Sequence, residues 1–83
     1  MSKGLLSLPI RRNVVFERGG STTHGFVEIT GISFDGNNIR CDIVAELGQR
    51  WERSVVGVDV MQALSVAIRI LESQMEDVRA RVE

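Results

Sequence analysis

Apolar and polar residues at positions 10–58 fall into segments that suit β-strands, and the clearest signal is alternation with a period of two. The cleanest run covers residues 39–47, in which every second side chain is apolar. Segments 10–18, 23–34 and 50–58 also suit strands. The pattern therefore predicts four strands in the first two thirds of the chain.

Turn-forming residues separate these strands. Two glycines begin the segment Gly19–Thr22, Asp35–Asn38 is the clearest turn signal in the chain, and Gly48-Gln49 suits a two-residue hairpin turn. Gly31 lies inside the second strand and is expected to mark a bulge. Because each turn is short, consecutive strands should pair as an antiparallel meander.

A helix is predicted after the fourth strand. Asp59 is a suitable N-cap, and Gln62 lies three residues further on, where its side chain can complete a capping box. The helix is expected to run from Val60 to about Val82, because no Gly or Pro interrupts this segment.

The expected fold class is α+β, a four-stranded antiparallel β-meander with one long C-terminal helix packed on one face (ββββα). With 83 residues the chain has room for a single domain, in which residues 1–9 form an N-terminal tail.

An apolar line with spacings of three and four residues runs along the predicted helix, through Met61, Leu64, Ile68, Leu71, Met75, Val78 and Val82. One interpretation makes this line the core stripe, with Val66 and Ile70 covered by Leu5, Leu6 and Leu8 of the tail. The other interpretation is that the far half of the helix leaves the sheet and pairs with a second copy of the chain.

The expected turns also assign side chains to the two faces of the sheet. They pair Ala45 with Glu52 and Phe16 with Gly25 on the helix side. The open face then carries an apolar band with one Trp and one Arg, and we predict a protein-binding surface of Val15, Phe26, Val44, Trp51, Arg53 and Val55. The alternative is that single outward hydrophobes are tolerated, or that Trp51 turns inward to cap the edge of the core.

Charge and composition narrow the classes of partner. Ten basic and eleven acidic residues give a net charge of −1, which argues against a nucleic acid or an anionic membrane surface as the partner. The single cysteine, Cys41, can form neither an internal disulfide nor a cysteine-built metal site. The apolar stretch near the N-terminus is too short for a signal peptide, and no run approaches the ~18 apolar residues of a membrane span, so a cytoplasmic protein is expected.

The residues capable of chemistry do not form a recognisable catalytic set. Cys41 is expected inside and His24 outside as a surface partner of Glu17, so the two cannot act together. The Gly19–Thr22 segment lacks the Lys and the helix of a phosphate loop, and Asp35–Asn38 lacks the ligand spacing of a calcium loop. We therefore predict no catalytic residues, no metal and no cofactor, and a protein that is not an enzyme.

From Cys41 onward the chain resembles a family of small uncharacterised bacterial proteins. The resemblance is carried by a strand with a central Cys, a Gly-bearing turn and the segment Gly57-Val58-Asp59-x-x-Gln62-Ala63-Leu64. Val60-Met61 is a mild departure from the expected Ser-Leu. The resemblance implies a sheet-plus-helix fold and a bacterial or phage origin, and it implies no activity.

The functional hypothesis from sequence is a non-enzymatic protein-binding module. Its specific form is an inhibitor or immunity-type protein that occludes a larger partner through the open sheet face. The alternative is a small homodimeric accessory or structural protein, so the expected partner is either another protein or a second copy of the chain.

Overall fold

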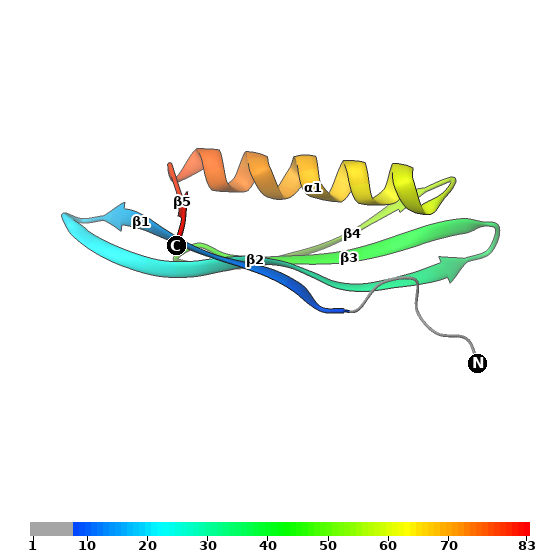
Figure 1. The fold of residues 1–83 in the computed structure, drawn as a ribbon, viewed down its shortest axis with the longest axis horizontal. Coiled ribbons are helices and arrows are strands. Elements are labelled where there is room, and N and C mark those ends of the chain that lie inside the picture. The colour runs from blue at the N-terminus through cyan, green and yellow to red at the C-terminus, as the bar shows by residue number, and fades with distance from the viewer. Residues whose placement is uncertain (1–7) are drawn as a thin grey trace.

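The computed structural model describes residues 8–83, which form one antiparallel sheet with a single helix lying along one of its faces (Figure 1). The strands are ordered β4-β3-β2-β1-β5 across the sheet. The predicted meander and C-terminal helix are both present, and β5 is an additional short strand that the sequence pattern did not predict. The elements are β1 (Ile10–Arg18), β2 (Ser21–Asp35), β3 (Asn38–Glu46), β4 (Arg50–Gly57), α1 (Val60–Asp77) and β5 (Arg81–Val82).

The β1–β2 hairpin turns on Gly19-Gly20 alone, and both glycines have positive φ angles, 59° and 82°. Because Ser21 already pairs with Arg18, Phe16 lies opposite Thr23 instead of the expected Gly25. The predicted register was therefore wrong by two residues. A shift of two preserves the faces of a strand, so Val14 and Phe16 are buried on the helix side as predicted.

Of the predictions for the β2–β3 and β3–β4 pairings, one is confirmed and the other is wrong. The bulge predicted at Gly31 is confirmed, since the β2–β3 register shifts between Ile29 and Gly31. The β3–β4 register, however, is wrong by one, because the connection uses three residues, Leu47–Gln49, and Glu46 pairs with Arg50. A shift of one reverses both faces of a strand. Trp51, Arg53 and Val55 of β4 consequently lie on the helix side and not on the open face.

The N-terminus of α1 has the capping box expected from the sequence. The Asp59 carboxylate accepts a hydrogen bond from the Gln62 amide at 2.8 Å, and the Gln62 side-chain oxygen accepts one from the Val58 amide at 2.7 Å. Gly57 permits a close approach here, because a Cβ at this position would lie 2.6 Å from the backbone nitrogen of Ala63. The Gly57–Ala63 part of the motif is thus explained by capping and packing.

The helix ends at Asp77, five residues before the predicted end at Val82. Arg79 adopts a left-handed conformation with φ of 55°, and the amides of Arg79 and Ala80 donate to the carbonyls of Glu76 and Met75. This is a Schellman turn, which reverses the chain direction. The chain then crosses to the outer edge of β1, where β5 pairs Val82 with Val14 (Figure 1).

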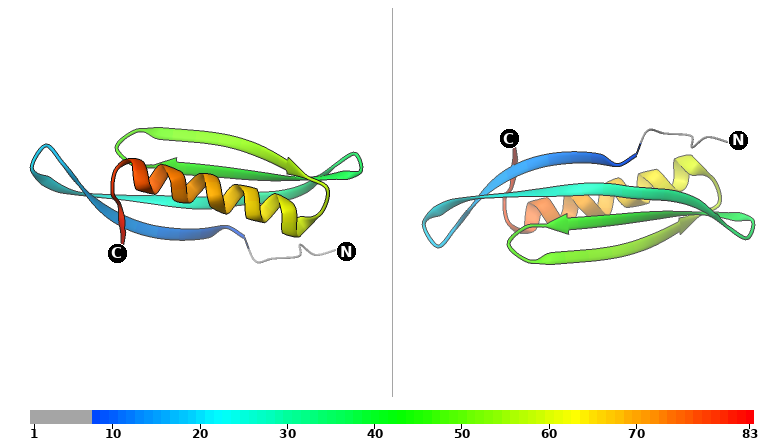
Figure 2. Two further views of the ribbon diagram at one scale, coloured as in Figure 1. Left: turned by 90° about the horizontal axis from the view of Figure 1, so that it is seen from above. Right: turned by 90° about the horizontal axis from the view of Figure 1, so that it is seen from below.

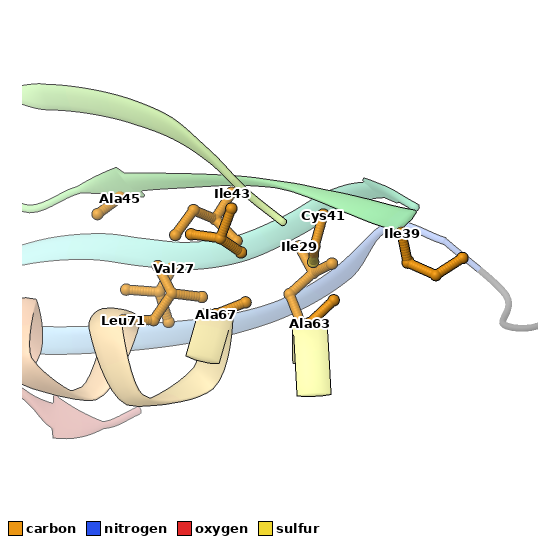
Figure 3. Packing of buried hydrophobic residues seen from close by; sticks show 10 residues of the cluster. Val27, Ile29, Ile39, Cys41, Ile43, Ala45, Ala63, Ala67 and Leu71 are labelled. Carbon is orange, nitrogen blue, oxygen red and sulfur yellow. The ribbon is translucent and has the colours of Figure 1, made fainter. Parts of the chain in front are cut away.

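The core lies between α1 and the central strands (Figure 3). The helix contributes Ala63, Ala67 and Leu71, whose small first two members let the backbone approach the sheet. The interpretation of the apolar line as the core stripe is wrong at Met61, which is 80 % exposed, and at Ile68, which is 45 % exposed. From the sheet come Val27, Ile29, Ile39, Cys41, Ile43, Ala45 and Val55.

The proposed cover over Val66 and Ile70 falls mostly on Leu5 and Leu6, which lie outside the described residues. Leu8 is described and packs against the core. Within residues 8–83, no helix has both the length and the apolar character needed to cross a membrane.

Candidate functional site: the groove between α1 and β1

The helix covers only part of the sheet. It packs mainly on β3 and β4 and to a smaller extent on β2. Seen from above, β1 runs beside the helix and not beneath it (Figure 2). The C-terminal half of β1 is nevertheless buried at Val14 and Phe16, so the uncovered part of this strand is its beginning.

A groove of about 450 Å³ lies along this boundary, and we call it the α1–β1 groove. Val27 and Ile29 of β2 contribute to its floor, and both are buried. The wall on the β1 side carries Ile10 and Arg12. The wall on the helix side is formed by Leu64, Ile68, Leu71, Glu72 and Met75.

Large apolar side chains stand exposed beside this groove. Ile68 on one wall and Ile10 on the other are 45 % and 44 % exposed, and Met61 lies two helical turns before Ile68 on the same flank. Contiguous exposed apolar side chains of this size are characteristic of interaction surfaces. The apolar line seen in the sequence therefore forms the flank of the helix that faces the uncovered strand.

Two opposite charges line the same groove. Arg12 belongs to the β1 wall and Glu72 to the helix wall. Among residues 8–83, neither side chain takes part in an ion pair. Arg11 and Glu28 also contribute to the lining, but they pair with each other. The groove thus combines an apolar floor with one basic and one acidic side chain, Arg12 and Glu72, that take part in no ion pair among residues 8–83.

The open face of the sheet, which Figure 2 shows from below, carries several paired charges. The Nε atom of Arg11 lies 2.6 Å from a carboxylate oxygen of Glu28, and its guanidinium stacks 3.7 Å above the ring centre of Phe26. Further ion pairs join Arg40 to Asp42 and Arg50 to Glu52. These contacts occupy the charged groups that would otherwise be available to a partner.

The six residues predicted to form one protein-binding surface lie on two faces. Val15, Phe26 and Val44 are on the open face, where Val44 is only 3 % exposed. The register change places Trp51, Arg53 and Val55 on the helix side, with Trp51 packed against the core. The predicted single patch was therefore wrong in its placement, and a binding role for the individual residues stays a prediction.

Ser54 and Asp42 are the nearest approach to a nucleophile and a base. The Ser54 hydroxyl donates a hydrogen bond to Asp42 Oδ1 at 2.5 Å. This bond, together with the Arg40 guanidinium, lowers the pKa of Asp42 despite some desolvation of the carboxylate. A carboxylate with a lowered pKa is a weak proton acceptor, so the pair is suited to joining β3 and β4 and not to activating a hydroxyl.

Cys41 and His24 lie on opposite faces of the sheet, as predicted. Cys41 is fully buried, and burial, followed by the charge of Asp42, raises the pKa of its thiol. His24 is paired with Glu83, whose carboxylate lies 3.0 Å from its Nδ1 atom, and not with the expected Glu17. The reason is again the β1–β2 register, which sets His24 opposite Val15.

Metal binding is not indicated by the side chains that the structure describes. Across residues 8–83, no three His, Cys, Asp or Glu side chains gather in an arrangement that could hold a metal ion.

The groove residues missed by sequence reasoning are Ile10, Arg12 and Glu72. The sequence feature that could have indicated them is the pair Ala63 and Ala67. These small residues lie four positions apart and mark the side of the helix that packs closely on the sheet. The larger apolar side chains on the neighbouring flank then belong to a different surface.

The resemblance of residues 41–64 to small bacterial proteins stays a prediction. Comparison of the chain with protein-family models, with curated proteins and with solved structures finds no match.

Proposed function

We propose that this protein is a non-catalytic protein-binding module and that its interface is the α1–β1 groove. The observation that supports the proposal is the coincidence of an apolar groove with the exposed side chains of Met61, Ile68 and Ile10. The open sheet face, which the sequence favoured, is replaced in this role because its charges are already paired.

The shape of the surface favours a macromolecule over a small ligand. A small-molecule site encloses most of its ligand's surface. Here, Met61 is 80 % exposed and stands outside the groove, so only a partner that extends beyond the groove would cover it as well as Ile68. Removing both side chains from water supplies the apolar contact that commonly dominates protein interfaces.

The edges of the sheet are less suited to binding by strand addition. Part of the outer edge of β1 is paired with β5. The exposed edge strand β4 carries Arg50, Glu52 and Arg53. Arg53 projects on the helix side, and a charge placed there disfavours the addition of another strand.

The proposal is tested by affinity isolation from native cells with three forms of the tagged protein. Ile68→Lys places a charge on the groove, whereas Val56→Lys is a matched control because Val56 is 50 % exposed and lies outside the groove. We expect wild type and Val56→Lys to retain the same partner protein, which can be a second copy of the chain. Ile68→Lys should retain at least tenfold less of that partner. Equal retention by all three forms, with equal thermal melts, contradicts the proposal.

An inhibitor that occludes a larger partner is the specific form of this function. If the retained protein is an enzyme, an equimolar amount of the wild-type protein should reduce its activity and Ile68→Lys should not. If the enzyme is bound but stays fully active, the proposal of an inhibitor is contradicted, whereas the proposal of a protein-binding module still holds.

A further inference from the structure

We infer that the occupant of the α1–β1 groove is a second copy of this chain, related by a two-fold axis that places α1 of each copy against β1 of the other. This inference rests on the proposed function, since it names the partner of the same groove. It is carried by three features of the surface: its shape, its charges and the part of the sheet left uncovered.

The surface is self-complementary in shape. The exposed Met61 and Ile68 form a ridge, and the groove lies directly beside that ridge on the same side of the molecule. A two-fold interface requires both complementary halves on one surface of each copy.

The charges of the groove are self-complementary as well. Arg12 and Glu72 line opposite walls and take part in no ion pair among residues 8–83. When α1 of one copy covers β1 of the other, Glu72 of the first approaches Arg12 of the second, and the symmetry makes this contact twice. The net charge of −1 causes little repulsion between copies.

The size of the protein gives a reason for such an arrangement. A domain of 83 residues buries a comparatively small share of its surface on folding. A second helix on the uncovered beginning of β1 would remove Ile10, Ile68 and Met61 from water together. Burial of apolar area of this kind is the main stabilising contribution in association.

The decisive experiment measures sedimentation over a range of concentrations at low salt, with wild type, Arg12→Glu, Glu72→Arg and an equimolar mixture of the two variants. We expect wild type to form dimers in a concentration-dependent way. Each variant alone sets like charges against each other in two contacts and should weaken dimerisation on the order of tenfold. In the mixture, each heterodimer has two contacts between opposite charges, one with the wild-type polarity and one reversed, and dimerisation should return.

The mixture separates contacts between copies from contacts within one chain. If the double variant Arg12→Glu/Glu72→Arg dimerises like wild type but the mixture does not, the two charges pair within one chain and the inference is overturned. Ile68→Lys should also be monomeric, whereas Val56→Lys, outside the groove, should dimerise normally.

Failure of this inference is distinguishable from failure of the proposed function. A wild-type protein that is monomeric at every concentration overturns the second copy as occupant, whereas selective loss of another protein by Ile68→Lys would still support the groove as an interface. A monomer that binds a hydrophobic dye only after deletion of residues 1–7 also overturns it, and assigns the groove to the chain's own N-terminal segment.

Discussion

Single residues in this protein are constrained where backbone approaches backbone. Gly57 is one such point on the helix side, where an added Cβ would lie 2.6 Å from the backbone nitrogen of Ala63. Asp42 on the open face accepts hydrogen bonds from both Arg40 and Ser54. Gly57 is therefore constrained by packing, and Asp42 is constrained by hydrogen bonds and charge.

Gly57→Ala should lower the free energy of unfolding by about 1–3 kcal/mol, because the added methyl group overpacks the contact with Ala63. The matched control is Gly31→Ala, whose Cβ would meet only Asp42 Oδ2 at an ordinary 3.5 Å. Urea unfolding of the two variants provides the measurement. Equal losses at both positions would show that close approach at Gly57 is not the cause.

Ser54→Ala should raise the pKa of Asp42, because the hydroxyl bond is the largest cause of the lowered value. A carboxylate whose pKa is lowered by folding stabilises the protein at neutral pH, and this contribution is lost as the pH falls through its folded-state pKa. The variant should therefore lose less stability than wild type on acidification. NMR titration of Asp42 measures this change in pKa, and Ser65→Ala on the helix is the control variant. An unchanged pKa in Ser54→Ala would contradict the Ser54 hydrogen bond as the main cause of the lowered value.

Whole elements are positioned by their ends. The capping box begins α1 directly after β4, and the Schellman turn ends it early enough for β5 to reach β1. The length of the β3–β4 connection decides which face of β4 meets the helix.

Arg79→Gly should raise the free energy of unfolding by about 1 kcal/mol, because a non-glycine residue in the left-handed region is strained and glycine is not. Ser73→Gly, at an exposed position inside the helix, should instead lower it by roughly 1 kcal/mol. Thermal melts of both variants make the comparison. Destabilisation by Arg79→Gly would mean that the arginine side chain contributes more than its backbone strain costs.

Trp51→Ala should destabilise the fold by about 2 kcal/mol, because the indole packs against the core and is partly buried. The register expected from the sequence puts Trp51 on the open face, where its loss would cost little stability, so the variant discriminates between the two registers. Val56→Ala on the opposite face of the same strand is the control and should cost well under 1 kcal/mol. A melt of Trp51→Ala that matches wild type would contradict the helix-side placement.

At the scale of the whole molecule, one hydrophobic core is shared by the sheet and a single helix. The protection of a core side chain from chemical reagents therefore reports on the stability of the entire fold. Cys41 lies at the centre of this core and is fully buried. The molecule is elongated, with extents of 47 × 21 × 17 Å, and the uncovered groove runs along the flank of the helix. Opening of the core therefore requires the helix to leave the sheet.

Cys41 in the native protein should react slowly with thiol reagents, because its thiol is buried and burial raises its pKa. The logarithm of the labelling rate should increase in Gly57→Ala in proportion to the loss in free energy of unfolding, since labelling requires opening of the core. Mass spectrometry over time, with the urea-unfolded protein as reference, gives both rates. Fast labelling of a native protein with an unchanged melt would place the thiol at the surface.

Local sequence signals determined the elements of this protein. The strand segment predicted at residues 10–18 matches β1 to its first and last residue, Asp35–Asn38 fixed the β2–β3 turn, and Asp59 with Gln62 fixed the start of α1. These features are local because a turn, a cap or a strand is stabilised by residues that are neighbours in the chain. The α+β class and the order of the four long strands followed from them.

Only the tertiary structure decided the faces of β4, the end of α1 and the location of the groove. One extra residue in the β3–β4 connection moved Trp51 and Val55 inward, and pairing of Val82 with Val14 shortened the helix. The flank carrying Met61 and Ile68 became a surface because the alanines, and not the longer side chains, allow the helix to approach the sheet. Each outcome depends on contacts between residues distant in sequence, where competing local patterns are equally acceptable until the packing of the core selects one.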